Sequence, residues 1–192
     1  MNHPLPPETA EHPLAPGQRL AEVERRELSP EALAEIRALA QRYPQRMAAT
    51  LPALYVAQRD FGFLSLGAMK AVARALELPE GHVFGVATFY TMFRKAPVGK
   101  YHMQVCTNLS CALRGAAQVV KKLAERTGAV PGGGPTADGL WSIEEVECLA
   151  SCGSGPCVQV NHGVYDEFLD EAALEQVLEA CRKGEVPAWG EE

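Results

Sequence analysis

The sequence lacks the features that mark secreted, membrane-spanning and nucleic-acid-binding chains. Its first residues have neither a basic region nor an apolar run, so we expect no secretory signal and cysteines that stay reduced in the cytosol. No run approaches the roughly 18 apolar residues of a membrane span, so membrane association must come through partners. With 18 basic against 24 acidic residues and a net charge of −6, the chain has no basic field for nucleic acid.

Motifs of several enzyme classes are missing too. A thioredoxin-like thiol oxidoreductase uses a Cys-x-x-Cys pair, and the sequence contains none. The glycine run 132–134 has no following Gly-Lys-Ser/Thr, so it is expected to be a flexible connector and not a phosphate loop. The five histidines are scattered, and His102, on the polar side of a predicted strand, is expected to be solvated. We expect no catalytic site in this chain alone.

Cysteines are the positive signal. Four of the six form two pairs, Cys106-x4-Cys111 and Cys148-x3-Cys152, and each pair lies where a predicted strand runs out into a loop. Two loop tips can bring four thiolates to one point, which is the requirement of an iron-sulfur cluster.

Four cysteines can also form a structural zinc site or a disulfide framework. A structural zinc site prefers Cys-x2-4-Cys spacing, which only the second pair has. A disulfide framework suits small secreted chains that cannot build a core, whereas this chain has 192 residues and is 47% hydrophobic. Of the remaining cysteines, Cys181 continues an apolar helical stripe and is expected to be a buried small side chain. Cys157 is expected to be a free thiol near the site, although spacing leaves it open as a ligand.

The chain is expected to be an α+β protein with a helical first half. Residues 1–28 are rich in proline and predict a disordered tail. Ser29 and Pro30 signal a helix start, and helices over about 30–42, 46–59, 66–78 and 80–90 form a small bundle that fills residues 29–95. The aromatic run 84–90 is expected either to pack between the two halves or to anchor a partner. The anchor candidates are Phe89, Tyr90 and Phe93.

The second half, residues 96–183, is expected to be a βαββα unit followed by a short tail, 184–192. Residues 100–106 alternate apolar with polar, which indicates a half-buried strand. A helix is predicted over 112–127, so that Cys111 would lie just before its positive N-terminal end. Strands follow at 141–148, 157–161 and 164–165, and the last helix is expected at 171–182.

Three further residues suit an anionic cluster. Gly153 and Gly155 directly follow Cys152 and allow close backbone approach. Arg114 is either an outer cation near the site or an exposed arginine at a helix start.

Over residues 30–180 the sequence resembles one family of NADH-quinone oxidoreductase subunits. Members of this family are the small 2Fe-2S subunits of the NADH-oxidising arm of respiratory complex I. The matching segments are 85–91 (GVATFYT), 99–107 (GKYHMQVCT), 110–111 (SC), 138–139 (DG), 146–152 (VECLASC), Pro156 and 160–161 (VN). Two departures are Cys157, where the family usually has an aliphatic residue or methionine, and a longer proline-rich tail.

The resemblance implies a thioredoxin-like 2Fe-2S ferredoxin domain behind an N-terminal helical domain, with one 2Fe-2S cluster on Cys106, Cys111, Cys148 and Cys152. It also implies a flavoprotein partner that holds FMN and NADH, and a place on the inner face of the cell membrane through the assembled complex. Two alternatives are the equivalent small subunit of an NAD-linked formate dehydrogenase or hydrogenase, and a zinc-stabilised interaction module.

Overall fold

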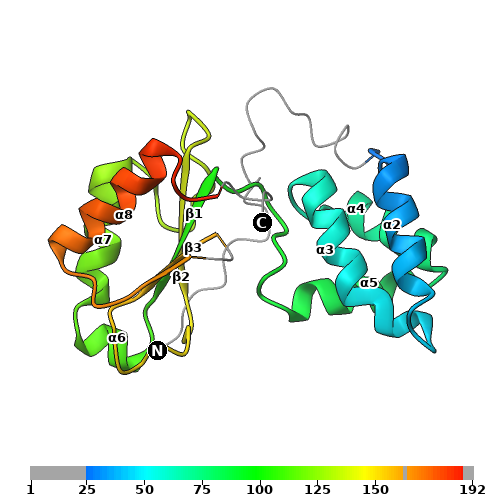
Figure 1. Ribbon diagram of the computed structural model, residues 1–192, viewed down its shortest axis with the longest axis horizontal. Helices are drawn as coiled ribbons and strands as arrows, with labels where there is room; N and C mark the ends of the chain where they lie inside the picture. The colour runs from blue at the N-terminus through cyan, green and yellow to red at the C-terminus, as the bar shows by residue number, and fades with distance from the viewer. Residues whose placement is uncertain (1–24, 162–163, 188–192) are drawn as a thin grey trace.

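The chain folds into a helical half and a sheet half that lie side by side (Figure 1). The computed structural model describes residues 25–161 and 164–187. The expected disordered tail therefore falls almost entirely outside the described residues, as does the turn at 162–163. Each half has its own cluster of buried apolar side chains.

Two helices of the helical half begin at a capping serine. The Ser29 hydroxyl accepts from the Ala32 N–H at 3.2 Å and the Ser65 hydroxyl from the Ala68 N–H at 3.1 Å, which satisfies otherwise unpaired donors at two helix starts. Gly62 ends one helix with a φ of 86°, a conformation that glycine adopts without strain. The elements are α2 (Pro30–Ala40), the 3-10 helix η1 (Arg46–Ala49), α3 (Thr50–Phe61), α4 (Leu66–Leu76) and α5 (Glu80–Phe89).

Residues 25–28 belong to the helical half, although their composition predicted a continuation of the tail. Arg26 lies over the Phe61 ring, with 4.8 Å from its guanidinium carbon to the ring centroid. Glu27 pairs with Arg74 at 2.7 Å, and Leu28 packs against the bundle core.

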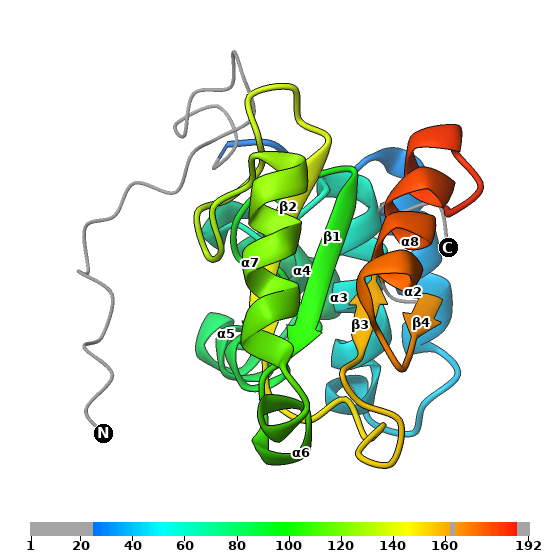
Figure 2. The same ribbon diagram turned by 90° about the vertical axis from the view of Figure 1, so that its left-hand side faces the viewer.

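The sheet half holds a mixed four-stranded sheet in the order β2-β1-β3-β4. β1 pairs with β2 in parallel and with β3 antiparallel. Two helices, α7 and α8, cover one face of this sheet, and the helical half lies on the other side (Figure 2). The elements are β1 (Tyr101–Cys106), α6 (Leu109–Leu113), α7 (Ala116–Thr127), β2 (Trp141–Val146), β3 (Val158–Val160), β4 (Val164–Asp166) and α8 (Glu171–Lys183). The predicted α+β class is confirmed.

The helix expected over 112–127 is two helices, and this changes the position of Cys111. Gly115 has a φ of 97°, which ends the short helix α6 and starts α7. Cys111 consequently lies inside α6, so the prediction that it precedes a helix N-terminus is wrong.

The polar side of β1 is buried, contrary to the sequence interpretation. His102 is 4% exposed and Gln104 7% exposed, because the linker that follows α5 runs over this face of the sheet. The His102 ring lies 2.7 Å from the Ser142 hydroxyl and 3.2 Å from the Glu144 carboxylate. The expected solvated imidazole is therefore wrong.

One arginine of this linker connects the two halves. The Arg94 N–H donates to the Gln58 side chain at 2.7 Å, and the Arg94 carbonyl accepts from the Leu64 N–H at 2.6 Å. Its guanidinium pairs with Glu144 on β2. Backbone and side chain of one residue thus join the bundle to the sheet.

Among the helices of the described residues, none is long and apolar enough to cross a membrane.

Candidate metal centre

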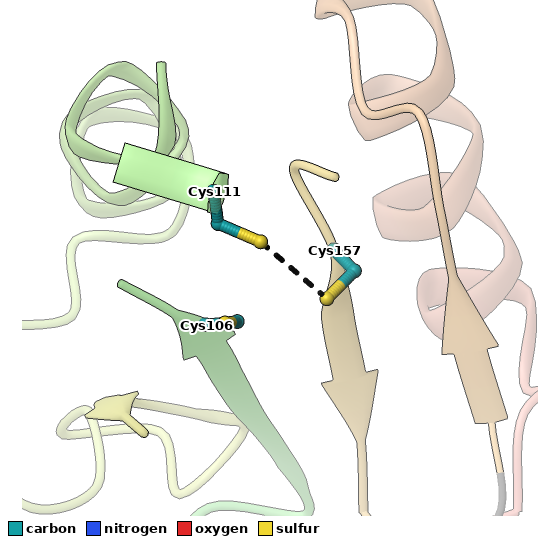
Figure 3. Close-up of side chains that lie close together, drawn as sticks. All are labelled: Cys106, Cys111 and Cys157. Carbon is teal, nitrogen blue, oxygen red and sulfur yellow. Dashed lines mark hydrogen bonds between the residues drawn. The ribbon is translucent and has the colours of Figure 1, made fainter. Parts of the chain in front are cut away.

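Three buried cysteines meet at the end of β1 (Figure 3). The sulfur atoms of Cys106, Cys111 and Cys157 all lie within 4.8 Å of one another. Cys106 ends β1, Cys111 projects from α6, and Cys157 precedes β3. The Cys106 N–H donates to the Cys157 carbonyl at 3.2 Å, so strand pairing holds these two residues side by side.

The second predicted pair forms a separate, exposed group. The sulfur atoms of Cys148 and Cys152 lie 3.3 Å apart, and both side chains are open to solvent. They lie in the loop that leaves β2, which bends sharply at Ala150 with a φ of 67°. The Ala150 N–H donates to the Cys148 sulfur at 3.3 Å.

The two groups influence each other electrostatically. The Leu149 backbone, next to Cys148, helps to lower the pKa of the Cys106 thiol. The pKa of Cys152 is raised, chiefly by Cys148 and to a smaller extent by the charge of Cys111, while Ser110 acts to lower it. All four predicted ligands therefore lie at one end of the sheet, two buried and two exposed.

The surroundings of the cysteines distinguish one thiol from the others. Burial opposes ionisation of Cys106, but hydrogen bonds from the Leu149 and Asn108 backbones help to lower the pKa of this thiol. Burial and the hydrogen bond with Cys106 raise the pKa of Cys111. Burial and the charge of Cys111 raise the pKa of Cys157 to about 12. Because metal ions bind thiolates, most of these residues release a proton on ligation.

The two glycines expected to line the site have different roles. A Cβ atom built on Gly155 would lie 2.8 Å from the Cys111 sulfur, while one built on Gly153 meets no atom within 4 Å. Close approach to a cysteine therefore requires glycine only at position 155. Arg114 donates to the Gly153 carbonyl at 3.3 Å and lies over the Phe168 ring, so it connects the Cys152 loop to α6.

The aromatic run divides into exposed and buried members. Phe84 and Phe89 on α5 are 46% and 77% exposed, and Tyr90 is 36% exposed. These side chains therefore do not form a packed seam between the halves. Phe93, a further anchor candidate, is fully buried in the bundle core. The prediction that Phe93 anchors a partner is therefore wrong.

Sequence reasoning missed two features near the site. One is the polar group formed by buried Arg94, His102 and Ser142 with the partly exposed Glu144. Its signal in the sequence is that β1 and β2 carry matching polar positions in register. The other is a set of exposed apolar side chains on α6, which carries Cys111, and in the segment after β4. Its members are Leu109, Leu113 and Phe168, which are 70%, 81% and 61% exposed.

Known proteins resemble the chain in both sequence and fold. The family of thioredoxin-like [2Fe-2S] ferredoxins matches residues 36–182. An NADH-quinone oxidoreductase subunit of Rhizobium meliloti is 40% identical over 151 residues, which cover 79% of this chain and 89% of the relative. NADH-quinone oxidoreductase subunit 2 of Thermus thermophilus is 41% identical over 145 residues, which cover 74% and 80%.

A solved structure shares the fold at low sequence identity. The NAD+-reducing [NiFe]-hydrogenase in its air-oxidised state superimposes with a TM-score of 0.54 and 20% identity over 85% of this chain. The match spans 24% of that hydrogenase chain, so this likeness concerns the fold alone.

The donor atoms present here suit the cluster that the family description names. Thiolates are the ligands that iron-sulfur clusters use, and cysteine sulfurs gather at this end of the sheet. Gly155 leaves room for a sulfur where a side chain would not. The sequence resemblance is confirmed: this chain belongs to the thioredoxin-like [2Fe-2S] ferredoxin family and, within it, to the small [2Fe-2S] subunits of NADH-quinone oxidoreductase.

Proposed function

We propose that this chain carries one [2Fe-2S] cluster on Cys106, Cys111, Cys148 and Cys152 and acts as an electron-transfer subunit of an NADH-quinone oxidoreductase. The observation that supports the proposal is that a buried cysteine group at the end of β1 and an exposed cysteine pair in the loop after β2 occur together in a chain of this family. The chain itself performs no bond-making step.

When bound, such a cluster accepts and returns one electron. The protein contributes sulfur ligands and hydrogen bonds to sulfur, which set the reduction potential. The Leu149 and Asn108 backbones already help to lower the pKa of the Cys106 thiol. Cys106 and Cys111 are buried while Cys148 and Cys152 are exposed, so the exposed pair marks the side from which electrons enter or leave.

The partner in this proposal is a flavoprotein subunit that binds FMN and NADH, within a complex attached to the inner face of the cell membrane. The exposed aromatic side chains of α5, Phe84 and Phe89, together with Tyr90, supply a contact surface for a neighbouring chain of the complex. The exposed cysteine pair lies in the other half of the molecule, so the helical half and the redox half contribute different parts of the interaction.

Metal analysis and spectroscopy of the purified chain test the cluster. We expect two iron atoms and two sulfides per chain and an EPR signal on one-electron reduction. The exposed ligands are replaced singly, as Cys148→Ala and Cys152→Ala, and each is expected to lose the signal. Cys181→Ala, a change at a buried position of α8, is the matched control and should keep the EPR signal. A colourless, zinc-bound wild-type chain would instead support the zinc-stabilised interaction module.

Co-purification tests the assignment to a complex. The isolated chain is expected neither to bind nor to oxidise NADH, because the nicotinamide chemistry belongs to the flavin partner. NADH should reduce the cluster once the flavoprotein subunit is added. Recovery of a formate dehydrogenase or hydrogenase subunit in place of quinone-reductase subunits would assign the chain to one of those complexes.

A further inference from the structure

Cys157 lies inside the ligand shell of the proposed site, although it is not one of the four assigned ligands. Its sulfur is 4.0 Å from that of Cys111 and within 4.8 Å of that of Cys106. The side chain is fully buried. The assigned ligand set leaves this thiol without a role.

Two backbone features hold Cys157 in this position. The Cys106 N–H donates to the Cys157 carbonyl at 3.2 Å, which extends the pairing of β1 with β3 beyond Val158, the first residue of β3. On the other side, Gly155 packs its Cα against Cys111 at a distance that excludes a Cβ atom. The backbone at Cys157 is thus held next to Cys106, and Gly155 allows close approach to Cys111.

The distance between the Cys111 and Cys157 sulfurs is close to the distance between two ligands of one metal ion. Tetrahedral coordination with metal–sulfur bonds of about 2.3 Å separates two ligating sulfurs by about 3.8 Å. The distance from Cys111 to Cys157 is 4.0 Å, so the Cys157 sulfur lies about one coordination position away from the Cys111 sulfur. A small rotation of one side chain exchanges one sulfur for the other.

We propose that Cys157 is a reserve ligand, meaning a thiol that binds cluster iron when Cys111 is absent or modified. It gives up its proton and takes the vacated coordination position as a thiolate. The inference rests on the proposed [2Fe-2S] function and adds a fifth cysteine to the site. Cys148 has no such substitute, because its nearest sulfur neighbour, Cys152 at 3.3 Å, is itself an assigned ligand.

Single and double cysteine variants of the full chain test this role by iron content, visible absorption and EPR. We expect Cys111→Ala to keep about the wild-type iron content with an all-thiolate spectrum. Cys148→Ala should lose iron at least about tenfold, since even outer-shell changes cost 10–100-fold in metal affinity. Cys111→Ala/Cys157→Ala should lose iron to the same extent. The matched control Cys111→Ala/Cys181→Ala should behave like Cys111→Ala.

A serine variant decides the matter if Cys111→Ala fails to fold. Cys111→Ser should show the wild-type spectrum if Cys157 binds in its place, whereas serine ligation shifts the absorption and EPR signals because alkoxide is a harder ligand. Loss of iron in Cys111→Ala equal to that in Cys148→Ala, or a serine-ligated spectrum in Cys111→Ser, overturns the proposal. Iron retained in the Cys111→Ala/Cys157→Ala double variant overturns it as well. Absence of a [2Fe-2S] cluster from the wild-type chain would instead refute the proposed function.

Discussion

The guanidinium of Arg94, in the linker between the two halves, forms an ion pair with the carboxylate of Glu144 on β2. The arginine side chain is 7% exposed and the glutamate side chain 40%. His102 contacts the same carboxylate oxygen at 3.2 Å. Since the Arg94 backbone is bound to Gln58 and Leu64 of the helical half, this pair is a structural link between the bundle and the sheet.

Removing the carboxylate should destabilise the fold. Glu144→Gln leaves the buried Arg94 guanidinium without its counter-charge, and we expect the free energy of unfolding to fall by about 1–3 kcal/mol, less than for a fully buried pair. Glu145→Gln, an exposed neighbour on the same strand, should stay within about 0.5 kcal/mol of wild type. Urea unfolding measures both. Equal stability of the two variants would show that the ion pair contributes little.

The same carboxylate predicts how stability depends on pH. Burial raises the pKa of Glu144, but the hydrogen bond with His102 and the charge of Arg94 outweigh it, so this pKa lies below its ordinary value. A lowered folded-state pKa stabilises the protein above the unfolded value of about 4.3 and less as the pH falls through the folded-state value. The stability difference between wild type and Glu144→Gln should therefore be constant from neutral pH to about 5 and shrink at lower pH.

Urea unfolding of the two proteins between about pH 3 and 7 measures this difference, in a range that spans the ordinary carboxyl pKa. A difference that grows on acidification would have the wrong sign for a stabilised carboxylate.

Replacing one glycine should disturb the cluster while its neighbour tolerates the same change. In Gly155→Ala the new Cβ would lie 2.8 Å from the Cys111 sulfur, so that sulfur must move and we expect a shifted EPR signal of the reduced cluster. Gly153→Ala meets no atom within 4 Å and should keep the wild-type signal. EPR spectroscopy compares the two variants. If both give the wild-type signal, the close packing at Gly155 is not required by the site.

Two phenylalanines near the end of the helical half should have opposite roles. Phe93→Ala removes a fully buried ring from the bundle core and should cost about 3–5 kcal/mol of stability. Phe89→Ala, at 77% exposure, should leave stability within about 0.5 kcal/mol but weaken association with the flavoprotein subunit about fivefold or more. Thermal unfolding and binding titration separate the two effects. Unchanged binding in Phe89→Ala would remove this ring from the interface.

Local sequence signals determined the elements of both halves. Ser29 with Pro30 marked a helix start that the structure contains, because a capping side chain acts on a backbone group only a few residues away. Strand alternation located β1, and the paired cysteine spacings located the end of the sheet that carries the sulfurs. These features depend on neighbours in the chain, so sequence alone suffices to find them.

Tertiary structure alone decided how buried and how close the key residues are. His102 looked solvated because alternation cannot reveal that a linker from residues 91–98 covers the polar face of β1. Cys157 is far from Cys111 in sequence, yet Gly155 and the β1–β3 pairing bring their sulfurs to 4.0 Å. Burial and sulfur–sulfur distance depend on contacts between segments distant in the chain, and these exist only once the sheet, its loops and the linker have packed together.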